Sequence, residues 1–321
     1  MSVSEHSSLA ARLLAWAHQR FPPVANAVLC AFLYAASVIC GRAETQPGGV
    51  AFSALDALGF LAVYAALLML RVYDEHKDYA IDLQNHPQRV LQRGLITLSH
   101  LKVLGAIAIA VQLVASLSFD RSAPTIVGPV TQRWLVVVVW SALMAKEFFV
   151  REWLSRRLVL YAVSHMLILP MAVLWVVQMG ALSAALPQSA YLLAGIALIS
   201  GFAFEIGRKA RAPADERPTV DSYTKVLGLR GTVGALIALS AALGLALALF
   251  VLRTKQVGLP ILGLAVAALT AALPAAPLLN FRREPTSQGG KKIEAAIALQ
   301  TLLAYGLVAG SWLAQRGALW R

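Results

Sequence analysis

The chain has 321 residues, of which 59% are hydrophobic and 14% are charged, so it carries too little polar surface for an ordinary water-soluble globule. A formal net charge of +12 raises nucleic acid as a partner, and the distribution of the basic residues has to decide that question. The composition predicts an integral membrane protein, with membrane lipids as its solvent.

The first residues have an amphipathic pattern. Leu9, Leu13 and Trp16 share one helical face, opposite polar residues, and they are not part of an uninterrupted apolar run. This pattern predicts an interfacial amphipathic N-terminal helix within residues 1–22.

Apolar stretches long enough to cross a hydrocarbon core, about 20 residues each, recur with short polar breaks. They predict an all-α, polytopic membrane protein with nine transmembrane helices, forming one domain over residues 1–321. The nine predicted spans are 24–41, 51–72, 101–119, 132–149, 158–179, 189–206, 231–252, 257–279 and 292–314.

The basic residues are distributed unevenly between the two predicted sides. The N-terminal segment and the breaks after the second, fourth, sixth and eighth spans hold 21 of the 28 Lys and Arg residues. The positive-inside rule therefore places the N-terminus and these loops in the cytoplasm, and the odd helix count places the C-terminus outside. The basic charge is thus explained by topology, without nucleic acid. The strong bias and the absence of a transit peptide favour a bacterial inner membrane.

The chain has only sixteen acidic residues, and half of them lie in two short segments. Both segments follow even-numbered spans and so face the predicted cytoplasm. Acids beside a bilayer are costly unless they are solvated, paired or metal-bound, which marks both segments as functional candidates. They contain Asp74, Glu75, Asp78 and Asp82 in the first segment and Glu205, Asp215, Glu216 and Asp221 in the second.

In the first segment, steps of four residues place Asp74, Asp78 and Asp82 on one face of a helix that continues the second span. Three aligned carboxylates repel one another unless divalent cations lie between them, and carboxylate-held Mg²⁺ is the usual arrangement for phosphate chemistry. The alternative is a solvated helix end balanced by Arg71 and Lys77.

A basic stretch follows the first segment. Pro87 ends any helix, so that Arg89 and Arg93 are free to turn back as diphosphate ligands, because guanidinium groups match phosphate oxygens. The alternative is that these arginines only set the membrane orientation.

The second segment mixes acids and bases. Glu205 and Lys209 are one turn apart and suited to pairing, whereas Arg208 and Arg211 are available to an anion ahead of Asp221. This mixture suits a metal and diphosphate complex, in which acids hold the metal and bases hold the phosphate. The alternative is an ordinary salt-bridged surface loop.

Together the two segments resemble the aspartate-rich motifs of the UbiA superfamily of intramembrane prenyltransferases. The first family motif, N/D-D-x-x-D-x-x-x-D, is matched from Asp74 to Asp82, and the following R-P-L-x-x-G is matched by Arg89 to Gly94 with Val90 in place of proline. The second family motif, D-x-x-x-x-x-x-D-x-x-D-D, is matched only in part. Three of its positions hold Glu205, Asp215 and Glu216, the fourth is Ala212, and Asp221 is available to compensate.

The resemblance implies a central, lipid-accessible cavity with a cytoplasmic polar cap. It also implies Mg²⁺-dependent transfer of an isoprenyl group from a prenyl diphosphate donor to a lipophilic acceptor, with an aromatic acceptor expected. Six acids are the expected metal ligands: Asp74, Asp78, Asp82, Glu205, Asp215 and Asp221. The expected diphosphate ligands are Arg89, Arg93, Arg208, Lys209, Arg211 and Lys225, and the expected catalytic residues are Asp74, Asp78, Asp82, Lys77 and Arg89.

Three further residues are expected to line the substrate cavity: Tyr73, Tyr161 and His165. Aromatic faces stabilise an allylic cation, and a histidine near neutrality orients an acceptor hydroxyl or takes its proton. The alternative is that all three are packing residues or interface anchors.

Other functions share part of this pattern. A UbiA-type terpene cyclase uses the same ionisation step without an acceptor, and a sugar-phosphate transferase uses a different donor at a similar site. A membrane transporter is a different class, and its essential charges are expected near mid-membrane, whereas these acids lie at the predicted cytoplasmic ends.

Overall fold

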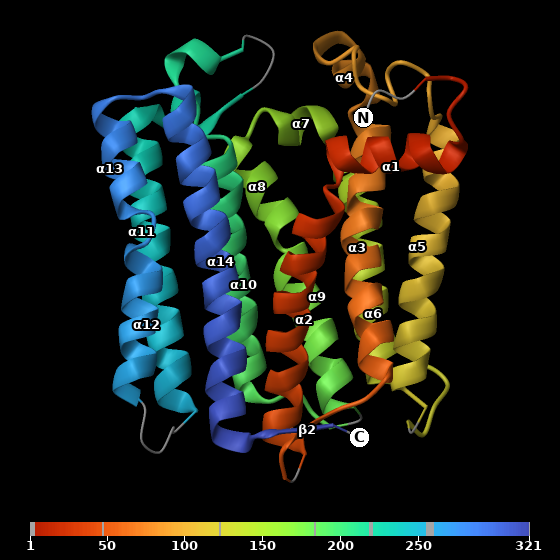
Figure 1. The fold of residues 1–321 in the computed structure, drawn as a ribbon, viewed down its shortest axis with the longest axis vertical. Coiled ribbons are helices and arrows are strands. Elements are labelled where there is room, and N and C mark those ends of the chain that lie inside the picture. Colours follow the sequence, from red (N-terminus) through yellow and green to blue (C-terminus); the bar gives the residue numbers. More distant parts are fainter. Residues whose placement is uncertain are drawn as a thin grey trace.

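The computed structural model describes residues 4–46, 48–121, 123–182, 184–217, 221–254 and 260–320. Residues 1–3 of the predicted N-terminal segment and residues 257–259 of the predicted eighth span lie outside these ranges. In Figure 1 the long helices run side by side and α1 lies across one end of the bundle. The elements in chain order are α1 (Leu9–Arg20), α2 (Pro23–Thr45), β1 (Val50–Phe52), α3 (Leu55–Lys77), α4 (Tyr79–Asn85), α5 (Leu98–Phe119), α6 (Pro129–Ala145), η1 (Glu147–Phe149), α7 (Arg151–Ser155), α8 (Leu158–Met166), α9 (Ile168–Ala181), α10 (Gln188–Arg208), η2 (Pro213–Asp215), α11 (Tyr223–Arg253), α12 (Pro260–Ala272), α13 (Ala275–Arg283), α14 (Ser287–Arg316) and β2 (Ala318–Trp320).

The predicted class, an all-α polytopic membrane protein, is confirmed. Over the described ranges, eight helical segments are long and apolar enough to cross a membrane: α2, α3, α5, α8 with α9, α10, α11, α12 with α13, and α14. The predicted fourth span corresponds to α6, an apolar helix of 17 residues that falls short of this length. The predicted count of nine is therefore not confirmed.

Three membrane-length segments are interrupted. α8 and α9 meet at Leu167, and α12 and α13 meet at Pro274, which lacks the backbone N–H that would continue a helix. α11 changes direction at Gly228, whose φ of 69° is a conformation that glycine adopts without steric cost. The hydropathy of these runs predicts none of the three breaks, because it is an average over a whole membrane-length segment.

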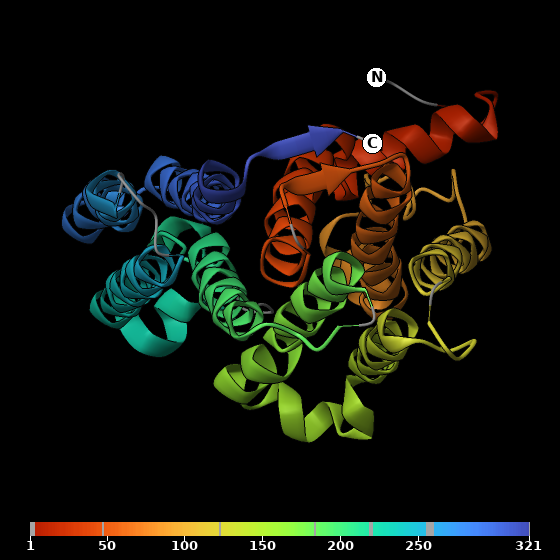
Figure 2. The same ribbon diagram turned by 90° about the horizontal axis from the view of Figure 1, so that it is seen from below.

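The centre of the bundle is formed where α2 crosses α9. A Cβ atom added to Gly41 would lie 2.3 Å from the carbonyl oxygen of Val177, and one added to Gly180 would lie 2.3 Å from that of Val38. Small residues at a crossing allow the two backbones to touch, which is the usual source of helix association in lipid. Figure 2 shows the later helices, in teal and blue, on one side of this crossing, and α3, α5 and α6 on the other.

The two ends of the bundle differ. At the end that holds β2, the strands β1 and β2 pair in parallel (Figure 2), and several polar side chains are paired. Asp56 binds Arg42 at 2.8 Å and Tyr34 at 2.7 Å, while Gln178 accepts a hydrogen bond of 2.8 Å from Arg133. These contacts are structural. The acidic segments lie at the opposite end, beside α1.

The N-terminal helix α1 docks on the protein. Trp16 is buried among apolar side chains of the segment after α4, including Leu91 and Ile96. The Arg12 guanidinium donates to the Leu95 carbonyl at 2.9 Å, and the Gln19 side chain accepts from a backbone N–H at 3.0 Å. α1 therefore forms part of the polar end of the bundle.

Candidate active site

The first acidic segment spans a helix break. α3 ends at Lys77, Asp78 has non-helical dihedral angles (φ −97°, ψ 4°), and α4 begins at Tyr79. The prediction of one continuous helix is therefore wrong at Asp78, because aspartate is a weak helix former and like charges one turn apart oppose helix continuation. The Asp78 N–H still donates to the Asp74 carbonyl at 2.8 Å, and the Asp82 N–H donates to the Asp78 carbonyl at 2.8 Å. The three acids thus keep a one-turn spacing around a bend.

Asp82 is neutralised by two arginines. Its carboxylate lies 3.0 Å from Arg20 and 2.9 Å from Arg89. Arg20 also pairs with the buried Glu75. Since Arg20 comes from α1, the N-terminal helix supplies the countercharge for half of the first acidic segment. Sequence reasoning missed this role, because Arg20 is 55 residues away from Glu75 and no pattern links them.

Asp74 and Asp78 are less constrained. The Asp74 side chain is 43% exposed and has only long ion pairs, at 3.5 Å to Arg71 and 3.6 Å to Lys77. Over the described ranges, the Asp78 carboxylate has no ion pair or hydrogen bond. Partial burial raises the pKa of Asp78 above its usual range, and Asp74 and Asp82 raise it further, while Lys77 opposes the rise. The negative charge at Asp78 is thus only partly compensated by the protein.

In the second acidic segment, the acids are engaged. Glu205 is buried at the end of α10, where it pairs with Arg208 and lies 2.7 Å from Lys209. Asp215 accepts a hydrogen bond of 2.8 Å from Ser287 at the start of α14. Asp221 is exposed, 3.6 Å from Lys225.

Glu216 also serves the local structure. Its carboxylate accepts hydrogen bonds from Ser222 at 2.5 Å and from Thr224 at 2.8 Å. Ser222 in turn caps α11 by accepting from the Lys225 N–H at 3.0 Å. Glu216 therefore fixes the start of α11, which explains an acid at this position without a metal.

Across the described chain, no three His, Cys, Asp or Glu side chains are close enough together to hold a metal ion as they stand. The six predicted metal ligands are therefore not preassembled, and their metal roles stay predictions. The predicted ligands with weakly engaged carboxylates are Asp74, Asp78 and Asp221, and of these Asp74 and Asp78 are one turn apart.

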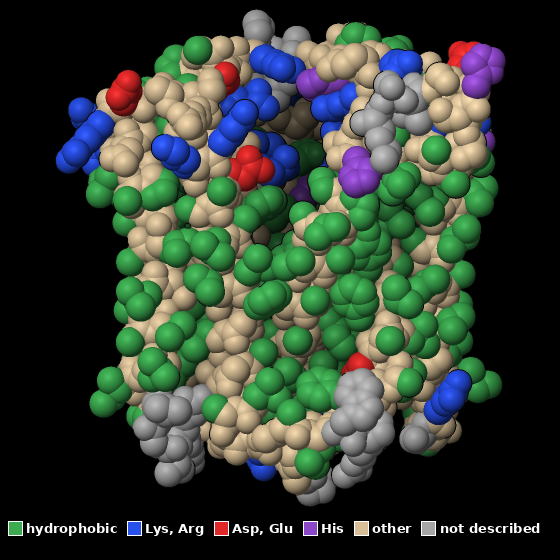
Figure 3. Space-filling model, in the orientation of Figure 1, with side chains coloured by type: hydrophobic (Ala, Val, Ile, Leu, Met, Phe, Trp, Pro, Cys, Tyr) green, Lys and Arg blue, Asp and Glu red, His purple; other side chains and the backbone are tan. Residues whose placement is uncertain are grey.

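The two segments lie at the same end of the bundle and influence one another. Arg208 of the second segment acts electrostatically on Arg71 of the first. Partial burial lowers the pKa of His86, and Arg89 lowers it further, while Asp82 opposes the change. Figure 3 shows a hollow at this end, between the regions of α14 and α1, rimmed by basic and histidine side chains.

Lys77 joins the first segment to α8. Its ammonium donates to the Tyr161 hydroxyl at 2.9 Å and lies 5.6 Å from the centre of the Tyr161 ring. The Tyr161 ring stacks on His165 with centroids 4.0 Å apart. His165 Nδ1 contacts the Tyr161 carbonyl at 2.9 Å, and its buried Nε2 has no partner among the described residues. Tyr161 and His165 are thus brought together beside Lys77, and their cavity-lining roles stay predictions.

The other predicted diphosphate ligands are spread along the two segments. Arg93 is exposed, and Arg211 is half-buried; neither has an ion pair within the described parts of the chain. Lys225 is engaged by Asp221, and Arg89 by Asp82. Of the predicted diphosphate ligands, Arg93 and Arg211 are therefore the ones whose guanidinium groups have no ion pair within the described residues.

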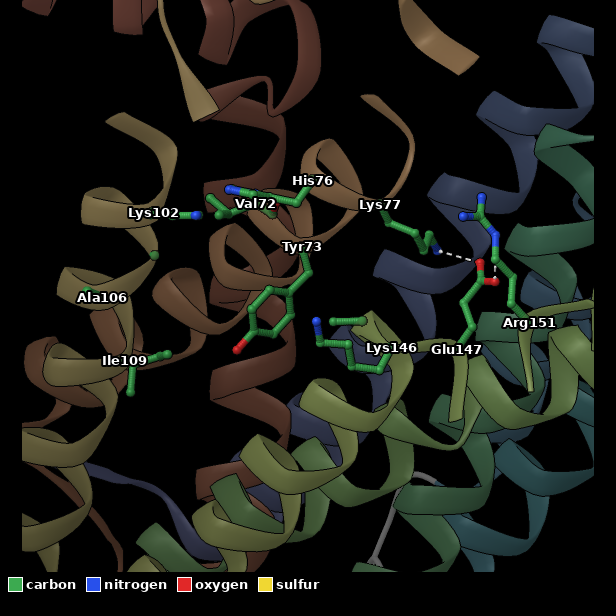
Figure 4. A pocket seen from close by; sticks show the side chains of 12 residues that line it. Val72, Tyr73, His76, Lys77, Lys102, Ala106, Ile109, Lys146, Glu147 and Arg151 are labelled. Atoms are coloured by element: carbon green, nitrogen blue, oxygen red, sulfur yellow. Dashed lines mark hydrogen bonds and ion pairs between the residues drawn. The ribbon is translucent and has the colours of Figure 1, made fainter. Parts of the chain in front are cut away.

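A separate cavity of about 630 Å³ lies between α3, α5 and the end of α6 (Figure 4). Tyr73 lines this cavity and not the Tyr161 and His165 cluster. The sequence did not single out His76 and Lys102 as lining residues, because His76 lies within the first acidic segment and Lys102 lies near the start of an ordinary apolar span.

No protein-family model matches the chain, and neither does any curated protein sequence. Solved structures do match. A digeranylgeranylglyceryl phosphate synthase is 16% identical with a TM-score of 0.59, covering 94% of this chain and 99% of its own. The apo structure of a UbiA homolog from Aeropyrum pernix K1 is 14% identical with a TM-score of 0.61, covering 90% and 97%.

A UbiA homolog from Archaeoglobus fulgidus bound to DMAPP and Mg²⁺ is 14% identical with a TM-score of 0.57, covering 92% of this chain and 99% of its own. The same homolog has also been solved bound to GPP and Mg²⁺. The chain therefore has the fold of the UbiA homologs over nearly its whole length, which confirms the fold that the two acidic segments suggested.

Proposed function

We propose that this chain is an intramembrane prenyltransferase of the UbiA superfamily, which transfers an isoprenyl group from a prenyl diphosphate to a lipophilic acceptor with Mg²⁺. The observation that carries the proposal is the pair of weakly engaged carboxylates, Asp74 and Asp78, at the polar end of a UbiA fold. The structural neighbours bound to DMAPP or GPP with Mg²⁺ support the same donor class.

The residues fit a magnesium ion. Asp74 is partly accessible, and Asp78 carries a charge that the protein compensates only in part. Mg²⁺ takes one or two carboxylates together with phosphate oxygens, so these two acids are sufficient protein ligands. Bound there, Mg²⁺ neutralises the charge that develops on the leaving diphosphate.

The basic residues complete the diphosphate site. Lys77 lies 3.6 Å from Asp74, and Arg208 lies at the end of α10, at the same end of the bundle. Both are placed to bind phosphate oxygens, and Arg93 and Arg211 have guanidinium groups left for the same task. Arg89 acts indirectly, since it holds Asp82.

The Tyr161 and His165 pair lies beside Lys77 and is proposed to contact the reacting part of the substrates. The Tyr161 ring presents an aromatic face beside Lys77, which suits an allylic cation formed as diphosphate leaves. His165 Nε2 is buried without a partner and is available to orient an acceptor group or to take its proton. The apolar surroundings exclude water that would otherwise capture the cation.

The sidedness of the enzyme follows from the charge distribution. We propose that the end holding α1 and both acidic segments faces the cytoplasm of a bacterial inner membrane, with β2 outside. The donor, a charged diphosphate, then reaches the site from the side on which the basic residues gather.

The test is diphosphate release by the purified protein in detergent, with geranyl, farnesyl or geranylgeranyl diphosphate and Mg²⁺, with and without aromatic or lipid acceptors. We expect Mg²⁺-dependent release and a prenylated acceptor. A cyclised hydrocarbon without acceptor would indicate the terpene cyclase reaction. Absence of release from every donor would overturn the prenyl proposal, and conversion of a sugar phosphate or uptake into proteoliposomes would identify the competing class.

A further inference from the structure

The cavity between α3, α5 and α6 lies apart from the acidic segments. Successive residues of a helix are about 100° apart around its axis. Around the axis of α3, the position of His76 is therefore about 160° from that of Asp74, and the position of Tyr73 is about 140° from the one that Asp78 would take if the helix continued. His76 and Tyr73 line the cavity, whereas Asp74 and Asp78 do not. The cavity is therefore on the opposite face of α3 from the carboxylates of the candidate active site.

The polar half of the cavity is strongly basic. It is lined by Lys77, Lys102, Lys146, Arg151 and His76, against a single acid, Glu147. Glu147 is already shared, since it lies 3.3 Å from Arg151 and 4.0 Å from Lys77.

Three nitrogen groups of the lining are unpaired. Neither Lys102 nor Lys146 has an ion pair or hydrogen bond to any residue that the structure describes, and His76 Nε2 is buried without a partner there. In Figure 4 the His76 ring and the Lys102 ammonium point toward each other, and Lys146 lies beside the Tyr73 ring. The arrangement leaves uncompensated positive charge around one small space, which an anion would neutralise.

The other half of the cavity is apolar. Val72, Gly105, Ala106, Ile109 and Ala145 form its wall. The absence of a side chain at Gly105 lets α5 pack closely on α3 at this wall, because a Cβ there would lie 3.2 Å from Val72 Cγ1.

The cavity also adjoins a lipid-facing surface. The outward faces of its helices carry exposed apolar residues, among them Val103 and Ile107 on α5 and Val139 on α6. A ligand with an anionic head and a hydrocarbon tail fits a cavity that is basic at the polar end of the bundle and apolar toward its middle.

We propose that this cavity binds an anionic phospholipid from the leaflet at the polar end, with its phosphate between Lys102, Lys146 and His76 and an acyl chain along Ile109. The site is independent of the proposed prenyl transfer. It shares only Lys77 with the candidate active site, which is why Lys77 is left unchanged in the test.

The test is native mass spectrometry of the delipidated full-length protein with phosphatidylglycerol, phosphatidylcholine or inorganic phosphate. We expect phosphatidylglycerol to bind at least about tenfold more tightly than phosphatidylcholine, because basic groups near a membrane surface attract anionic headgroups. The double variant Lys102→Gln/Lys146→Gln should lose this preference, and Lys102→Arg/Lys146→Arg should keep it. Lys291→Gln/Lys292→Gln is the matched control, since it removes two exposed lysines from the start of α14 at the same end.

Equal binding of the two lipids would overturn the proposal, and so would an unchanged preference in the Lys102→Gln/Lys146→Gln variant. Displacement of the lipid by inorganic phosphate at equal concentration would also overturn it, because the site would then recognise a soluble anion. Thermal unfolding in detergent checks that each variant is folded. Diphosphate release is measured in parallel, so that failure of the lipid site and failure of the proposed enzyme are separate results.

Discussion

The ends of α3 and α10 each carry a group of acids at the same end of the bundle, but they hold them differently. At the end of α3, Asp74 has only long ion pairs and Asp78 has none among the described residues. At the end of α10, Glu205 is buried against Arg208 and Lys209. The first end therefore keeps two neighbouring carboxylates that are weakly engaged, whereas at the second end, among the described residues, only the exposed Asp221 is held as weakly.

This difference assigns separate tasks to the two ends. A site that ionises a diphosphate needs oxygen ligands for Mg²⁺ on one side and donors for phosphate oxygens on the other. The first end supplies the acids. The second end supplies bases, and its own acids mainly stabilise the local structure. The four predictions below sharpen or break this division.

The largest effect is expected from Asp78→Ala, which should lower the rate of diphosphate release by about 10³-fold, since it removes a proposed metal ligand from the reacting charge. The matched variant from the second end is Asp221→Ala. Asp221 is 58% exposed and has a long ion pair to Lys225, so its loss should cost less than about fivefold. Equal losses in the two variants would contradict the division.

The next largest effect is on stability. Glu205→Gln leaves the charges of Arg208 and Lys209 unpaired beside a buried side chain, so the free energy of unfolding should fall by about 3 kcal/mol. Denaturation in detergent measures this change, with Asp221→Asn as the exposed control. If Glu205→Gln instead keeps its stability and weakens Mg²⁺ dependence, Glu205 is a metal ligand and the second end is misassigned.

A smaller effect is expected from Arg20→Gln on α1. Among the described residues, it leaves Arg89 as the only ion-pair partner of Asp82 and removes the partner of buried Glu75. It should therefore lower the apparent Mg²⁺ affinity, or raise the KM for the donor, by about tenfold. Arg20→Lys should recover part of the loss, as a retained charge would. An unchanged KM with reduced stability alone would mean that Arg20 only anchors α1.

The smallest effect concerns pH. The pKa of Asp78 is raised by partial burial and by the neighbouring carboxylates, so the Mg²⁺-free folded state binds its proton more tightly than the unfolded chain does. The stability linked to this proton is present at acidic pH and is lost as pH rises through the folded pKa.

Asp78→Asn, which removes the charge, should therefore raise the melting temperature in EDTA at neutral pH by no more than a few degrees. The difference from the wild type should shrink as the pH falls. Melting curves in EDTA across the acidic range measure it, and a difference that grows on acidification would contradict the raised pKa.

Much of the fold was predictable from the sequence because lipid imposes simple rules. A long apolar run in lipid has to form a helix, and the uneven distribution of basic residues between the loops predicts which side of the membrane each loop faces. Eight membrane-length segments accordingly match predicted spans. The breaks at Leu167 and Gly228 were not predictable, since they leave the hydropathy of the run unchanged. The fourth span was predicted to end at Phe149, whereas α6 ends at Ala145, because the charged pair Lys146 and Glu147 precedes Phe148 and Phe149.

The site was predictable only in part. Scarce acids identified Asp74 and Asp78, and one-turn spacing identified the pairing of Glu205 with Lys209. The role of Arg20 depends on how α1 folds back, which local spacing does not encode. The placement of Tyr73 away from Tyr161 likewise depends on the face of α3 that meets α5.

The central claim is that the first end holds a prenyl diphosphate through Mg²⁺ and Asp78. The most direct measurement is equilibrium binding of a non-reactive geranyl thiodiphosphate to the wild type and to Asp78→Ala, each with Mg²⁺ and with EDTA. We predict tight binding only by the wild type with Mg²⁺, at least about 100-fold weaker in the other three cases. Equally tight binding by the wild type in EDTA, or by Asp78→Ala with Mg²⁺, would contradict the claim.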